Sequence, residues 1–147
     1  MLFLEELLSD APQRTLLITR PRRFGKTMMM SMLFEFFDIN KNSSNLFRDL
    51  SISKNIDICN KWMNKYPTIY ITLRDLDCDS FSIFLDRFAL YIRQFLNEHK
   101  YLLDNQRVSK IHKEDILNLI GDQYNIRKLE HSLVTICSAL YEHYEKR

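Results

Sequence analysis

A short stretch near the start of the chain constrains the fold more than any other feature. Residues 15–19 (Thr-Leu-Leu-Ile-Thr) are leucine or β-branched residues, and they lead through Pro21 and Gly25 into an apolar segment. An extended run, a basic turn and a helix in this order are the context that a phosphate-binding loop requires. In such loops, backbone N–H groups and the helix N-terminus face the phosphates. The stretch therefore predicts a buried strand, a nucleotide-binding loop and a helix over residues 15–38.

The predicted nucleotide site consists of consecutive residues of this loop. They are Arg22, Arg23, Phe24, Gly25, Lys26 and Thr27. Lys26 is expected to reach the β- and γ-phosphates of ATP, and the Thr27 hydroxyl is expected to coordinate Mg²⁺. The predicted cofactors are thus ATP and Mg²⁺, and Thr27 is the predicted metal-binding residue.

The loop departs from the pattern G-x-x-x-x-G-K-[ST] at one position, where Arg20 replaces the first glycine. Pro21 restricts the backbone at the same point and substitutes in part for that glycine. Gly-Lys-Thr alone is a weak signal, so an accidental basic turn is the alternative interpretation. The chain has only two glycines, and one lies where the motif needs it, which favours the nucleotide loop.

The run from Ile18 to Thr27 resembles the phosphate loop of the predicted AAA-ATPase-like family, which also lacks the leading glycine. The resemblance covers essentially the whole chain; its further landmarks are residues 2–8, 31–37, 45–47 and 66–72. It implies a P-loop NTPase-like α/β fold. Longer family members continue into a Walker B strand, and many carry a restriction-endonuclease-like nuclease domain. The resemblance therefore implies that residues 1–147 are part of an ATPase domain that ends before the Walker B strand. The expected partners are a nucleotide, the remainder of that domain and a nuclease-like domain.

The rest of the chain predicts one more strand and a helical C-terminal half. Residues 68–73 are rich in β-branched residues, which indicates a second strand. Asp75 and Asp77 follow it, where open α/β sheets bind ligands, although a helix cap or a solvated turn explains them equally well. Over residues 79–147 apolar residues recur at intervals of three and four, which predicts helices. We expect a break at 104–110, a helix that stops at Gly121 and a last helix over 129–144.

No strand ending in acidic residues follows residue 80, so enzyme activity is left open and hydrolysis by this chain alone is not expected. Asn64-Lys-Tyr-Pro67 lacks the final aspartate of a guanine-recognition motif, which disfavours a GTPase. Two alternatives to ATP binding remain. One is a nucleic-acid-binding module that uses Arg20, Arg22 and Arg23 on phosphates, and the other is a helical interaction fragment with a vestigial loop.

Composition limits the cellular setting. The formal net charge is only +2, so the chain as a whole has no strong attraction for nucleic acid. Cysteines 59, 78 and 137 form no C-x-x-C pair, which indicates reduced thiols and a cytoplasmic location. No uncharged apolar run approaches about 18 residues, so we expect no membrane association.

Overall fold

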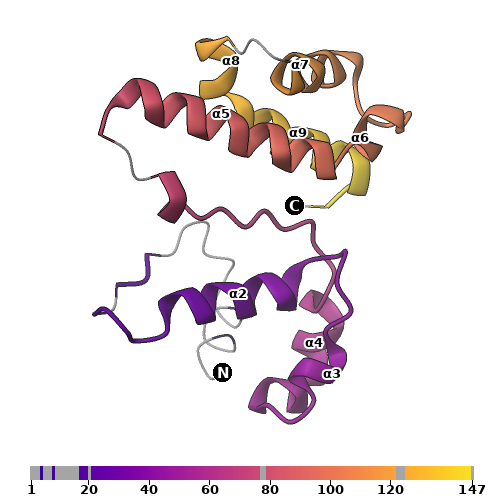
Figure 1. The fold of residues 1–147 in the computed structure, drawn as a ribbon. Coiled ribbons are helices and arrows are strands. Elements are labelled where there is room, and N and C mark those ends of the chain that lie inside the picture. The colour runs from indigo at the N-terminus through magenta and orange to yellow at the C-terminus, as the bar shows by residue number, and fades with distance from the viewer. Residues whose placement is uncertain are drawn as a thin grey trace. The chain divides into compact units, whose positions relative to one another are not determined.

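The structure is a computed structural model that describes residues 4, 8, 17–19, 21–76, 79–121 and 125–146, with residue 75 described by its backbone alone. It divides into two compact units, residues 1–70 and 71–147. In the described residues both units are built from helices (Figure 1). None of these helices has the combination of length and apolar character that crossing a bilayer requires.

The first unit contains one longer helix followed by several short ones. In chain order its described elements are α2 (Lys26–Phe37), α3 (Ser44–Phe47), the 3-10 turn η1 (Ser51–Lys54) and α4 (Ile56–Trp62). The predicted helix over residues 2–9 lies mostly outside the described residues, but Leu4 and Leu8 are both helical. α2 begins at Lys26, where the loop motif predicts a helix start.

The core of the first unit is a small aromatic and aliphatic cluster. Its fully buried members are Leu4, Phe36, Phe47 and Ile52. The ring of Phe36 meets the rings of Phe37 and Phe47 edge-on, at centroid distances of 5.2 and 5.3 Å. Edge-to-face contacts of this kind stabilise a pair beyond the apolar area that it buries. The C-terminal half of α2 is therefore the part of that helix fixed by packing.

Asn64 joins the chain after α4 to the end of α2. Its Nδ2 donates hydrogen bonds to the backbone oxygens of Glu35 (3.0 Å) and Asp38 (2.9 Å). Its Oδ1 accepts one from the backbone N–H of Ser43 (3.0 Å), and its own N–H donates to the Phe36 oxygen (2.7 Å). With φ at 53°, Asn64 occupies the left-handed region, which asparagine tolerates better than most residues. One side chain thus satisfies backbone groups from three separate points of the unit.

The second unit is a set of packed helices. Its described elements are η2 (Arg74–Leu76), α5 (Phe81–Glu98), α6 (Tyr101–Asp104), α7 (Lys110–Ile120), α8 (Ile126–Glu130) and α9 (Ser132–Tyr144). α7 contacts both α5 and α9, so it lies between them. Ala89, Ile92, Leu96, Ile116 and Ile136 are among the residues buried by this packing.

Polar residues set the starts of the main helices in this unit. Ser80 accepts a hydrogen bond from the N–H of Ile83 at the start of α5, and Ser109 accepts one from His112 at the start of α7. Each satisfies one of the N–H groups that the first turn of a helix leaves without a partner. α7 stops at Ile120, directly before Gly121, as predicted. The predicted last helix is instead interrupted at His131, which separates α8 from α9.

The predicted P-loop NTPase-like α/β fold is wrong, because the described residues form no sheet. Neither residues 68–73 nor residues 17–19 have regular secondary structure, and Leu17 is 85% exposed rather than buried. The one β-bridge in the described residues joins Asp38 to Tyr66, which precedes the predicted second strand. A β-branched sequence favours an extended backbone, but a strand forms only where a neighbour supplies hydrogen bonds. The described part of the chain is mostly helical.

Candidate functional site

The loop from Pro21 to Gly25 and the first turn of α2 bring the predicted site residues together. Arg22, Arg23 and Phe24 form the loop, Gly25 is the residue before the helix, and Lys26 and Thr27 begin it. The side chains of all these residues except Gly25 are exposed, and Phe24 is 67% exposed although it is aromatic. An exposed aromatic side chain flanked by cations is available to a ligand rather than to the core.

The backbone of this loop is unusual at two positions. Arg23 has φ at 68° and Gly25 has φ at 71°, so both occupy the left-handed region. Glycine adopts this region without penalty, whereas for arginine it is uncommon. Left-handed residues within a turn direct successive backbone N–H groups to one side, which is the geometry of anion-binding nests.

The start of α2 has no capping side chain among the described residues. The Gly25 oxygen accepts the first helical hydrogen bond, from the N–H of Met29 at 2.9 Å. Because a helix leaves its first N–H groups without partners inside the helix, this end carries partial positive charge and available donors. Negative groups are favoured there.

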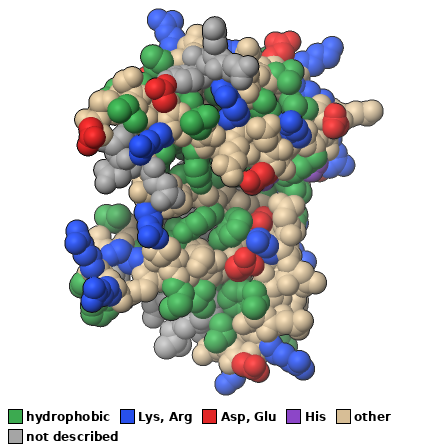
Figure 2. Space-filling model, in the orientation of Figure 1, with side chains coloured by type: hydrophobic (Ala, Val, Ile, Leu, Met, Phe, Trp, Pro, Cys, Tyr) green, Lys and Arg blue, Asp and Glu red, His purple; other side chains and the backbone are tan. Residues whose placement is uncertain are grey.

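Lys26 lies against its own loop. Its Nζ donates a hydrogen bond to the backbone oxygen of Pro21 at 3.1 Å. The ammonium group is therefore folded back over the turn that Arg22 and Arg23 form. Figure 2 shows basic side chains gathered over the loop before α2, where Arg22, Arg23 and Lys26 are all exposed. A cluster of three cations around a turn produces a local positive potential that the net charge of the chain does not reveal.

The structure describes neither of the acidic side chains that follow residues 68–73. Asp75 lies in η2 and its side chain is not described, and Asp77 lies outside the described residues, as do Arg20 and Cys78. Within the described ranges no group of three or more His, Cys, Asp and Glu side chains could hold a metal ion.

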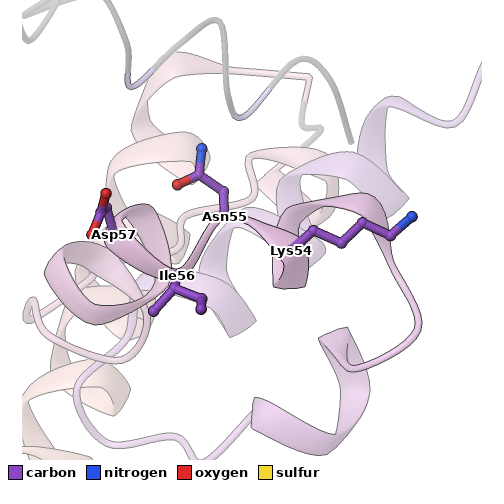
Figure 3. A pocket seen from close by; sticks show the side chains of 4 residues that line it. All are labelled: Lys54, Asn55, Ile56 and Asp57. Carbon is purple, nitrogen blue, oxygen red and sulfur yellow. The ribbon is translucent and has the colours of Figure 1, made fainter.

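A surface depression of about 590 Å³ lies elsewhere in the first unit, at the junction of η1 and α4. Lys54, Asn55, Ile56 and Asp57 line it, and Figure 3 shows their side chains pointing in different directions. The Asn55 side chain caps α4 by accepting a hydrogen bond from the Ile58 N–H at 3.2 Å. Ligand sites have polar groups that converge on one volume, and these do not.

A Ser, His and Glu cluster in the second unit has a structural role. His112 Nδ1 lies 3.0 Å from both Ser109 Oγ and Glu142 Oε2, and the Ser109 N–H donates to the same Glu142 oxygen at 2.8 Å. A relay through imidazole needs one partner on each ring nitrogen, but here both partners share Nδ1. Desolvation raises the pKa of Glu142, yet the hydrogen bonds from His112 and Ser109 and the charge of His112 outweigh it and lower the pKa below its usual value. The cluster joins the start of α7 to α9.

Neither described cysteine is activated. Cys59 and Cys137 are free thiols, and burial raises the pKa of each. Because the thiolate is the reactive form, a raised pKa makes a cysteine a poor nucleophile at neutral pH. Covalent chemistry at these residues therefore has no support in the structure.

Two features of the structure were not found from the sequence. In the sequence, Asn64 stands out only as part of an incomplete guanine-recognition motif, although asparagine tolerates the left-handed turn that it forms. The Ser109–His112–Glu142 contacts had one local signal, a serine three residues before a histidine at a helix start. Glu142 gave none, because it lies 33 residues from Ser109.

We compared the chain with protein-family models, curated proteins and solved structures. No curated protein and no solved structure was found to match the chain. A family model described as "Predicted AAA-ATPase" matches residues 2–147 and includes the whole loop described above. Because that match covers nearly the full length, the chain belongs to the AAA-ATPase-like family of predicted AAA-ATPases.

Proposed function

We propose that the loop from Pro21 to Thr27 binds the phosphates of ATP. The observation that carries the proposal is the pair of left-handed residues, Arg23 and Gly25, directly before an uncapped helix whose first residue is Lys26. This arrangement presents backbone N–H donors, a helix N-terminus and a mobile cation to one ligand. Membership of a family of predicted ATPases supports a nucleotide as that ligand.

In this proposal Lys26 exchanges partners on binding. Its Nζ leaves the Pro21 oxygen, 3.1 Å away, and donates to oxygens of the terminal phosphates. A hydrogen bond between two charged groups is stronger than one to a neutral carbonyl, so the exchange favours binding. Arg22 and Arg23 add positive potential, and the backbone provides the close contacts.

We propose Mg²⁺ as the companion ion, with the Thr27 hydroxyl as one of its ligands. Thr27 is exposed in the first turn of α2, one residue after Lys26. Mg²⁺ in nucleotide sites takes few protein ligands and retains several waters and phosphate oxygens. The chain's own part in this chemistry is therefore binding and orientation of the nucleotide. We also propose a cytoplasmic location, a compartment in which thiols such as those of Cys59 and Cys137 stay reduced.

Titration of the full chain with ATP tests the proposal, by calorimetry in the presence of Mg²⁺. Lys26→Ala should weaken binding by about 10-fold to 100-fold, because it removes a charge-assisted hydrogen bond worth about 1.5–3 kcal/mol. Lys65→Ala is the matched control, since Lys65 is also exposed and in the same unit but away from the loop. Arg23→Ala should cost less than Lys26→Ala.

Equal losses from Lys26→Ala, Arg23→Ala and Lys65→Ala would show non-specific attraction and refute the site. The same titration with single-stranded DNA distinguishes a nucleic-acid module. DNA binding that falls steeply with salt and is indifferent to ATP would assign the basic loop to nucleic acid instead.

A further inference from the structure

A contact at the C-terminal end of α9 determines where a proton resides. The Oδ1 of Asn105, in the connection between α6 and α7, accepts a hydrogen bond from the backbone N–H of Arg107 at 2.8 Å. A backbone N–H can only donate, so the accepting atom is the amide oxygen and the other end of the side chain is its NH₂ group.

The NH₂ group of Asn105 lies 2.7 Å from Nδ1 of His143. An amide NH₂ also only donates, so Nδ1 must accept and must carry no proton. The ring of His143 is therefore neutral in this contact, with its proton on Nε2. The chain of donors, from Arg107 through Asn105 to His143, leaves no other assignment that preserves both hydrogen bonds.

The surroundings of His143 oppose the uptake of a second proton. Desolvation and then the positive charge of Arg107 hold the pKa of His143 below its usual value. From α6 the ring of Tyr101 packs on it at a centroid distance of 5.0 Å, and within α9 the ring of Tyr144 does so at 4.4 Å. Neither ring offers a negative charge.

Three carboxylates of this unit, Glu145, Glu142 and Asp115, form ion pairs with other side chains. Glu145 Oε1 lies 3.8 Å from Arg107 Nη1. From α7, His112 contacts Glu142 at 3.0 Å, and from α8, Lys128 contacts Asp115 at 3.0 Å. None of these described contacts supplies a carboxylate to the Nδ1 of His143.

We propose that Asn105 and His143 form a proton-sensitive clasp, which holds the connection between α6 and α7 against the end of α9 and opens when His143 is protonated. A proton on Nδ1 would place two donors against each other at 2.7 Å, so the hydrogen bond is lost. The positive ring would also repel Arg107. The neighbouring contact between the Tyr101 and Tyr144 hydroxyls, at 3.2 Å, is the next to separate.

The opening is confined to one side of α9. His112 still donates to Glu142 when its ring is positive, and the Ser109 N–H donates to the same carboxylate. The start of α7 therefore stays attached to α9 under mildly acidic conditions. Only the stretch around residues 105–107 is released, because Leu102 and Val108 on either side of it are buried.

Nuclear magnetic resonance of the full chain tests the clasp directly. Long-range proton–nitrogen correlation at alkaline pH should show His143 protonated on Nε2 alone. Titration of its ring protons should give a midpoint below that of histidine in an unstructured peptide. As the pH falls through that midpoint, the protection factor of the Arg107 amide, taken against the intrinsic exchange rate at each pH, should fall, while that of the His112 amide does not.

In the variant Asn105→Asp, the midpoint of His143 titration should move upward instead of lying below the usual value. The carboxylate keeps an acceptor for the Arg107 N–H but replaces the donor to His143 with a second acceptor. A negative charge at hydrogen-bonding distance should raise the His143 midpoint by about 1 to 3 pH units. Asn97→Asp is the matched control, because it adds the same charge at an exposed position on α5 and should leave the midpoint nearly unchanged.

Two results would overturn the clasp. One is a neutral His143 ring with its proton on Nδ1, and the other is an equal midpoint in the Asn105→Asp and Asn97→Asp variants. If Asn105→Asp fails to fold, the tautomer and the midpoint of the unmodified chain decide the question on their own.

Discussion

Replacement of Asn64 is the sharpest test of how the first unit is held together. In Asn64→Ala, the backbone oxygens of Glu35 and Asp38 and the N–H of Ser43 lose their side-chain partner. A net contribution of about 1 kcal/mol for each hydrogen bond gives a loss of about 2–4 kcal/mol. The upper part of that range applies because Ser43 is only 1% exposed, so water cannot easily replace the lost acceptor.

The backbone adds a second contribution that can be separated from the first. Asn64 has φ at 53°, and alanine pays about 1–2 kcal/mol in the left-handed region. Asn64→Gly removes the same hydrogen bonds without that strain, although the greater freedom of glycine in the unfolded chain offsets about 0.5–1 kcal/mol of the difference. Asn64→Ala should therefore lower the free energy of unfolding by about 4–6 kcal/mol, and Asn64→Gly by up to about 1.5 kcal/mol less.

The chain offers a local probe for this measurement. Trp62 is the only tryptophan, and it stacks on Tyr66 at a centroid distance of 5.1 Å. Its fluorescence during urea unfolding thus reports the first unit, whereas circular dichroism reports all helices. Asn60→Ala, at an exposed position on α4, is the control. The reasoning fails if Asn64→Ala unfolds within 1 kcal/mol of the unmodified chain, or if Asn64→Gly is the less stable of the two variants.

Three further outcomes are expected. Gly25→Ala should lower the free energy of unfolding by about 1–2 kcal/mol and weaken ATP binding about tenfold. The reason is the backbone, because φ is 71° while the added Cβ would meet only Met28 Cε at 3.7 Å. Thermal unfolding and ATP titration check this, and an unchanged ATP affinity would contradict it. Thr27→Ala should retain its ATP affinity in EDTA but lose the enhancement by Mg²⁺, and an enhancement of the original size would exclude Thr27 as a ligand. The pKa of Glu142 is lowered on folding from 4.5, so its stabilising effect is complete above about pH 4.5 and is lost as the pH falls through the folded value. Glu142→Gln should therefore flatten the acid limb of the unfolding free energy against pH, and an identical acid limb would show that the Ser109–His112–Glu142 contacts contribute nothing.

Helices were predictable from the sequence where local signals set their ends. Lys26 begins α2 directly after Gly25, whose φ of 71° favours glycine, and α7 stops before Gly121, a residue with low helix propensity. The break at His131 could not be predicted in this way, since no glycine or proline marks it. The helical pattern continues across it without interruption.

The predicted strands failed for a reason that lies outside the strand sequences. Residues 68–73 have the composition of a strand but form none, because strand pairing depends on which other segment is available. Contacts between residues far apart in the sequence could not be predicted either, because they also depend on how the chain folds. Asn64 and Glu35 are 29 residues apart, and Asn105 and His143 are 38 apart. The six predicted loop residues are consecutive, so their proximity needed no knowledge of the fold, and their role in nucleotide binding stays a prediction.

The two ends of α2 differ in how much free energy is needed to open them. At the C-terminal end, Phe36 is completely buried and Asn64 bonds to the backbone of Glu35, Phe36 and Asp38. The N-terminal turn is exposed and has no capping side chain among the described residues. Local opening should therefore start at Lys26, and deuterium uptake should decline steadily toward Phe37. A ligand that contacts the first turn stabilises the part of the helix that opens most easily. Its affinity can therefore be measured as the decrease in deuterium uptake at the N-terminal end of α2.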